Sequence, residues 1–134
     1  MLICHKKVHL GEQTRILLYF LDSTGEKLVT EYRYVSLERI KEDICKTIIE
    51  ELIKGPNSSD YIATIPNETK INSIRQEGNK VILDLSSDYS QGVENSEEEL
   101  AKIYSIVNSL TEIKEIEEVE IDVDGKNIAT KSRL

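Results

Sequence analysis

Histidine pairs and carboxylate pairs are the arrangements in this chain that could do chemistry. His5 and His9 are its only histidines, and on a helix their spacing of four residues would turn both imidazole rings to one side. Two such rings can hold a metal ion, but a zinc site needs at least a third protein ligand, and none is near in the sequence. We interpret both histidines as part of an N-terminal tail, and we predict no metal site.

Asp84 and Asp88 form the most suggestive carboxylate pair, because they flank the end of a predicted strand. A carboxylate in such a place can act as a general base. Accidental pairs are frequent in a chain with 25 acidic residues, and aspartate in a loop commonly accepts hydrogen bonds from nearby backbone amides. We therefore favour a structural role, in which Asp84 accepts from the amides of the turn at 86–87.

Nucleophilic catalysis is not indicated. A serine or cysteine nucleophile needs a neighbouring base, usually histidine, and no histidine follows His9. The chain contains no Gly-x-Ser-x-Gly motif and no glycine-rich phosphate loop. The run 122–125 differs from an EF-hand, because its glycine comes too early and no acid closes a twelve-residue loop. We expect no enzymatic activity and no cofactor.

The composition indicates one acidic globular domain. A length of 134 residues fits a single domain, and the net charge of -8 argues against binding to nucleic acid or to an anionic membrane surface. No apolar run approaches the roughly 18 residues of a membrane span. Two cysteines make neither a disulfide framework nor a metal quartet. Cys45 falls among helix core positions, so we expect a small buried hydrophobe there.

Two helices stand out from the hydrophobic periodicity. Ser36 should cap the first, which runs over 37–54 with apolar residues at three- and four-residue steps, and Gly55–Pro56 should end it. The second should begin at Ser96, with Glu99 three residues on completing a capping box. Both helices have one apolar stripe.

Short strands surround these helices. They are expected over 15–21 and 28–35, over 70–76 and 80–85, and over 119–123 and 127–130. The order ββαββαββ predicts an α+β fold: a single, mostly antiparallel sheet of five to six strands with both helices packed on one face. Residues 1–13 should form a flexible tail and 14–134 the domain. The expected core comprises Leu37, Ile44, Ile48, Leu52, Val81, Leu83, Leu85, Leu100, Tyr104 and Val107.

The pattern as a whole resembles the GerMN domain, the sporulation and spore germination module of endospore-forming bacteria. The resemblance covers about 15–126, with two departures, Leu21 where proline is frequent and Ser109 where threonine is common. The matching residues are Leu18, Tyr19, Phe20, Asp22, Gly25, Gly55, Pro56, Ile65, Pro66, Thr69, the run 81–86, Tyr89, Gly92, the run 107–111, Asp124 and Gly125.

This resemblance implies a binding or assembly module rather than an enzyme. A related germination protein takes part in a ring-like channel complex between mother cell and forespore, which implies other sporulation and envelope proteins as partners and an extracytoplasmic location. That location requires a signal segment, which we do not see before Cys4, so a full-length chain would be cytoplasmic. The family commonly carries two modules in tandem.

Four residues that match family positions, Ser86, Asp88, Tyr89 and Asn108, are candidates for contact with a ligand or partner. We favour structural roles for them, in loop locking and helix capping. The alternative function is a domain that binds a small ligand, such as a cell-wall fragment, with the loop 86–92 as its mouth. A concave pocket with convergent polar groups would favour the ligand, and a flat apolar sheet face would favour assembly.

Tyr19 is the fifth candidate, because the strand around it is apolar on both faces. A sheet covered on one side needs only alternate residues buried, so Leu17, Tyr19 and Leu21 have no obvious partner. Either the loop 57–66 covers them, or they form an exposed patch for a partner or a second copy. We expect part of this face to be exposed and to serve assembly.

Overall fold

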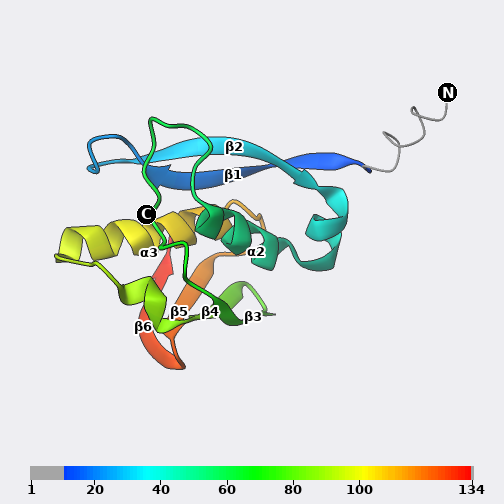
Figure 1. The fold of residues 1–134 in the computed structure, drawn as a ribbon. Helices are drawn as coiled ribbons and strands as arrows, with labels where there is room; N and C mark the ends of the chain where they lie inside the picture. The colour runs from blue at the N-terminus through cyan, green and yellow to red at the C-terminus, as the bar shows by residue number, and fades with distance from the viewer. Residues whose placement is uncertain (1–10, 134) are drawn as a thin grey trace.

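The computed structural model describes residues 11–133, and Figure 1 shows their fold. In chain order the elements are β1 (Gln13–Leu21), β2 (Leu28–Ser36), α2 (Leu37–Lys54), β3 (Ile71–Glu77), β4 (Lys80–Leu85), the 3-10 helix η1 (Ser87–Ser90), α3 (Ser96–Leu110), β5 (Glu118–Val123) and β6 (Lys126–Ser132). The predicted α+β order is confirmed. The predicted tail lies outside the described residues except for 11–13, and Gln13 already belongs to β1.

The strands form two sheets, so the prediction of a single sheet is wrong. β1 and β2 pair antiparallel as a separate hairpin, while the other four strands form a sheet in the order β3-β4-β5-β6. The neighbours β4 and β5 are parallel, and the other pairs of that sheet are antiparallel. The helices lie between the hairpin and the larger sheet (Figure 1), so they do not cover one face of a common sheet.

The division of the strands into two sheets has a physical cause in α3. This helix buries polar residues as well as its apolar stripe. Ser105 and Ser109 are fully buried, and both bond the backbone of β1. Their small hydroxyl side chains let a strand approach the helix closely, and they provide the hydrogen bonds that a neighbouring strand would otherwise supply. An analysis of hydrophobic periodicity treats these two serines as polar and therefore exposed. For that reason it predicts that α3 packs on one face only.

Helix α2 is capped as predicted but is not continuous. The Ser36 hydroxyl accepts a hydrogen bond from the Glu38 N–H at 3.2 Å, and Gly55 ends the helix with a φ of 89°. Inside the helix, Asp43 is non-helical (φ -163°, ψ 95°), and its Oδ1 accepts from the Lys46 N–H at 3.0 Å. Asp43 therefore caps a second helical segment at a kink.

Helix α3 begins at Ser96 as predicted, but its cap is the preceding residue. Asn95 has an extended backbone, and its Oδ1 accepts from the Glu98 N–H at 2.8 Å. The Glu98 carboxylate in turn accepts from the Glu94 N–H at 3.0 Å. The predicted capping box of Ser96 and Glu99 is wrong by one residue, because asparagine caps as well as serine does.

The core lies where both helices meet the inner faces of the two sheets. The predicted core residues that are buried are Ile48, Leu52, Val81, Leu83, Leu85 and Val107. Leu37, Ile44 and Tyr104 are only partly buried. The prediction for Leu100 is wrong, because this residue is 47% exposed on the N-terminal part of α3, which projects past both sheets in Figure 1. None of the helices between residues 11 and 133 is long and apolar enough to cross a membrane.

Candidate functional site

Tyr19 and Asn108 come together where β1 passes the end of α3. The Tyr19 hydroxyl donates to Glu112 Oε2 at 2.8 Å and accepts from Arg133 Nη2 at 2.6 Å. Arg133 also donates to Glu112 Oε2 at 2.5 Å and to the backbone carbonyl of Asn108 at 3.0 Å. Burial, followed by the hydrogen bond to Glu112, raises the pKa of Tyr19. The phenol thus stays protonated at neutral pH and ties β1 to Arg133, the residue that follows β6.

The edge of β1 opposite β2 is partly closed by other elements. The Ser105 hydroxyl donates to the Tyr19 carbonyl at 2.6 Å, and the Tyr19 N–H donates to Ser109 Oγ at 3.0 Å. Two residues later, Leu21 exchanges backbone hydrogen bonds of 3.1 and 2.8 Å with Ile62. The loop 57–66, which was one of the two alternatives for covering this strand, therefore reaches it at Leu21.

The N-terminal half of β1 leaves the same edge open. Arg15 and Leu17 direct their backbone N–H and C=O groups to the same side as Tyr19, because this direction alternates along a strand. Within residues 11–133, no hydrogen bond occupies the edge groups of Arg15 and Leu17. A groove of about 270 Å³ lies beside them, and it is also lined by Ile16, Tyr32, Ile44, Ile48, Glu112 and Ile113.

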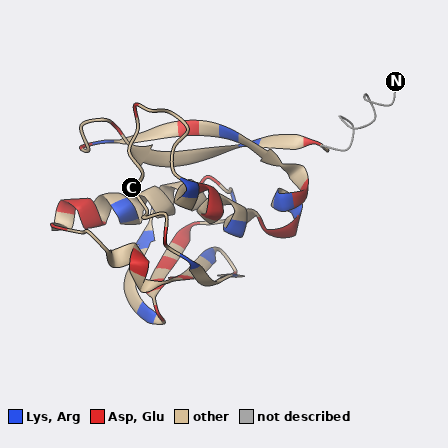
Figure 2. Cartoon of the chain, viewed as in Figure 1, with Lys and Arg blue, Asp and Glu red and all other residues tan. Residues whose placement is uncertain are grey.

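The outer face of the hairpin carries two exposed aromatic rings. Tyr32 is 59% exposed and Tyr34 66% exposed. In the β1–β2 register Tyr34 faces Arg15 and Tyr32 faces Leu17, so the four residues form one patch, which we call the hairpin face. The Arg15 guanidinium lies 4.0 Å from the centre of the Tyr32 ring. Figure 2 shows that the hairpin ribbon is mostly free of charged residues.

Ser86, Asp88 and Tyr89 lie elsewhere, at the end of β4. The Ser86 hydroxyl donates to Asp88 Oδ2 at 3.0 Å and accepts from the Lys70 N–H at 2.9 Å. Tyr89 is only 2% exposed, and its backbone carbonyl accepts from Lys102 Nζ on α3. These contacts join the start of β3, the end of β4 and α3, which is a loop-locking arrangement, and they do not bring the three residues to Tyr19.

Asp84 does not bond the turn that follows it. Its Oδ1 accepts from the Gly125 N–H at 3.0 Å, so it ties β4 to the β5–β6 turn, and the predicted contact with 86–87 is wrong. Between residues 11 and 133, no group of three or more His, Cys, Asp or Glu side chains is arranged to hold a metal ion. His5 and His9 lie outside the described residues.

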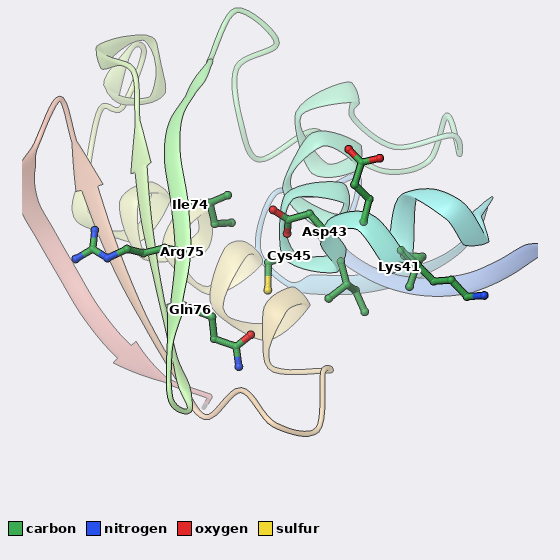
Figure 3. Close-up of a pocket in the computed structure, with 9 residues that line it drawn as sticks. Lys41, Asp43, Cys45, Ile74, Arg75 and Gln76 are labelled. Carbon is green, nitrogen blue, oxygen red and sulfur yellow. The ribbon is translucent and has the colours of Figure 1, made fainter.

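Cys45 lies in a groove of about 330 Å³ between the kink of α2 and β3 (Figure 3). The cysteine is buried, as predicted, and it is free. Burial, followed by the nearby charge of Asp43, raises the pKa of the Cys45 thiol to about 11. Because a thiol reacts as its thiolate, Cys45 is unreactive at neutral pH. Arg75 points to the opposite side of β3, away from the sulfur.

Arg33 is one of three buried charged residues that the sequence analysis missed, together with Glu51 and Lys102. It is 6% exposed and donates to the carbonyls of Glu51 at 3.0 Å and Gly55 at 2.8 Å. It also pairs with the carboxylates of Glu31 at 2.5 Å and Glu51 at 3.2 Å. The signal that could have found it is the alternation along β2, which puts residue 33 on the same face as buried Val35.

Comparison with known proteins identifies the family. Residues 17–129 match the family model Germane, described as sporulation and spore germination. The chain belongs to this family. The Germane match spans most of the described fold, and it confirms the resemblance that the sequence motifs indicated. No curated protein matches the sequence significantly.

Solved structures with a similar fold include the GerMN domains of the sporulation protein GerM from Bacillus subtilis. The tandem-domain structure is 23% identical with a TM-score of 0.76 over 91% of this chain, and the first domain alone is 20% identical with a TM-score of 0.71 over 86%. A candidate lipoprotein from Clostridium perfringens is 25% identical with a TM-score of 0.57 over 87% of this chain and 78% of its own length. This chain spans 45% of the tandem structure and 86% of the single domain.

Proposed function

We propose that this Germane domain is a non-catalytic interaction module of a sporulation or spore-germination complex in the cell envelope, working outside the cytoplasm. In this proposal other envelope proteins dock on the hairpin face and the open edge of β1. The single observation that carries it is the exposure of Tyr32 and Tyr34 beside Arg15 on a two-stranded sheet.

The hairpin face has the chemistry of a protein-binding surface. Tyrosine and arginine are, together with tryptophan, the residue types enriched among the side chains that dominate binding energy at interfaces. Leu17 adds an apolar side chain next to Tyr32. The open backbone groups of Arg15 and Leu17 add a second mode of binding, in which an extended segment of the partner pairs with the strand edge.

The alternative function, binding of a small ligand at the loop 86–92, has less support at the residues first considered for it. Ser86 and Asp88 bond each other, and Tyr89 is buried against Lys102. The Ser86 hydroxyl and the Asp88 carboxylate therefore bond each other inside the protein, whereas the buried Tyr89 hydroxyl has no hydrogen-bond partner among residues 11–133.

A tagged chain recovered from sporulating cells tests the proposal. We expect defined envelope partners to copurify with the wild type and to be lost with the double variant Tyr32→Ser/Tyr34→Ser, measured by quantitative mass spectrometry. Leu100→Ser is the matched control, because Leu100 is also an exposed apolar residue but lies on α3. Both variants should keep the wild-type unfolding midpoint, since exposed substitutions usually change stability by less than about 0.5 kcal/mol. Equal partner recovery with the double variant would contradict the proposal.

A further inference from the structure

A groove of about 420 Å³ lies between the end of α2, the following loop and α3. Its volume falls in the range of small-molecule sites, roughly 300–1,000 Å³. The walls come from the segments 53–56 and 63–67, together with Gln91 after η1 and Lys102 on α3. None of the candidates from the sequence analysis lines it.

Lys102 is the unusual residue of this groove. It is 8% exposed, and its ammonium donates to the Tyr89 carbonyl and lies 4.6 Å from the centre of the Tyr89 ring. An ammonium carries three donors, and among residues 11–133 no carboxylate forms an ion pair with it. Burial lowers the pKa of Lys102, and the charges of Glu98 and Glu99, one turn earlier on α3, oppose that effect. A buried cation without an ion-paired carboxylate is costly, and a bound anion would lower that cost.

The charged residues that line the groove are positive, whereas the chain as a whole is negatively charged. The protein has 25 acidic and 17 basic residues, yet the groove is lined by two lysines, Lys54 and Lys102, and by no acidic residue. Lys54 is already paired with Glu51 at 2.9 Å, so Lys102 is the cation that remains. The amide groups of Asn67 and Gln91 add further donors on the same walls.

We infer that this groove binds the oxyanion group of a small molecule, a carboxylate or a phosphate, with Lys102 as its counter-charge. The amide of Gln91 serves as a hydrogen-bond donor beside it. The site is separate from the hairpin face and does not depend on the proposed assembly function.

Titration of the ¹⁵N-labelled protein, followed by amide chemical shifts, tests this site. The probes are inorganic phosphate, N-acetylglycine and the uncharged N-acetylglycinamide. We expect saturable shifts at Gln91, Asn67 and the amides around residue 102 with one or both oxyanions, and none with the uncharged compound. The oxyanion that binds with the higher affinity identifies the class of ligand, a phosphate or a carboxylate.

Two variants and one control separate this site from general attraction to lysine. Lys102→Met removes the charge but keeps an unbranched apolar stem, and it should weaken binding by about tenfold or more. Gln91→Glu puts an acid at an exposed position of the groove and should weaken binding without affecting folding. Lys114→Met removes an exposed lysine outside the groove and should leave the affinity unchanged. Unchanged affinity of Lys102→Met, shifts scattered over surface lysines, or no saturable shift with either oxyanion would overturn the inference.

Discussion

Arg33→Met should lower the free energy of unfolding by about 2–6 kcal/mol. The last carbonyls of a helix have no partner within the helix, and Arg33 supplies donors to the Glu51 and Gly55 carbonyls at the end of α2. Methionine has a similar stem but no donor. Each buried acceptor left without a partner costs about 1–3 kcal/mol, and two such carbonyls give the expected loss.

The loss should not include the cost of an unpaired buried carboxylate, which makes breaking a buried ion pair cost about 3–5 kcal/mol. Glu51 keeps its contacts with Arg39 at 2.8 Å and Lys54 at 2.9 Å after the change. Glu31 likewise keeps the backbone N–H of Asn57, at 3.0 and 3.1 Å from its two oxygens. Neither carboxylate is therefore left without a partner.

Urea unfolding followed by far-ultraviolet circular dichroism measures this loss. The matched control is Arg39→Met, since Arg39 pairs with the same Glu51 but its side chain is 36% exposed. This control should cost less than about 1 kcal/mol, and the denaturant slope should be the same for both variants. A loss for Arg33→Met no larger than that of Arg39→Met would show that the buried network does not hold the hairpin to α2.

Three further predictions concern stability. Asn95→Ala should cost about 1 kcal/mol through loss of the α3 cap, and Ser96→Ala less than about 0.5 kcal/mol, in paired urea melts. Ile48→Ala should cost roughly 2–5 kcal/mol by leaving a core cavity, and a loss under about half a kilocalorie would mean that its helix face is not packed. Burial tends to raise the pKa of Glu31 and of Glu51, but their hydrogen bonds outweigh it and hold both below the ordinary value. The stability that these two carboxylates contribute should therefore be fully present above the unfolded pKa, about pH 4.3, and be lost as pH drops through the lower folded values; a rise in stability on acidification through this range would contradict these shifts.

The elements that the sequence predicts well are those fixed by local signals. Ser36 and Gly55 mark the ends of α2 because a hydroxyl can accept from the first helical amides and glycine can take a positive φ. Alternation predicts β4, whose Val81, Leu83 and Leu85 are fully buried. The kink at Asp43 was not predicted, although aspartate is a common cap, because the apolar stripe continues through it on both sides.

The contacts of the candidate site were not predictable, because they join residues far apart in the chain. Tyr19 meets Glu112 and Arg133 through contacts that span 93 and 114 positions. No periodic pattern connects such residues, and Arg133 has no feature in the sequence that distinguishes it from other surface arginines. Ser105 and Ser109 are similar cases, since a serine in a helix normally indicates an exposed position.

These same serines explain why the hairpin offers a docking surface at one end only. A strand edge presents unpaired N–H and C=O groups, and native proteins cover such edges. Here Ser105 and Ser109 cover the edge at Tyr19, and Ile62 covers it at Leu21. At Arg15 and Leu17 no such cover exists within residues 11–133, and the most exposed tyrosines of the hairpin lie directly across from these two residues. The proposed docking surface therefore begins where the intramolecular cover of β1 ends.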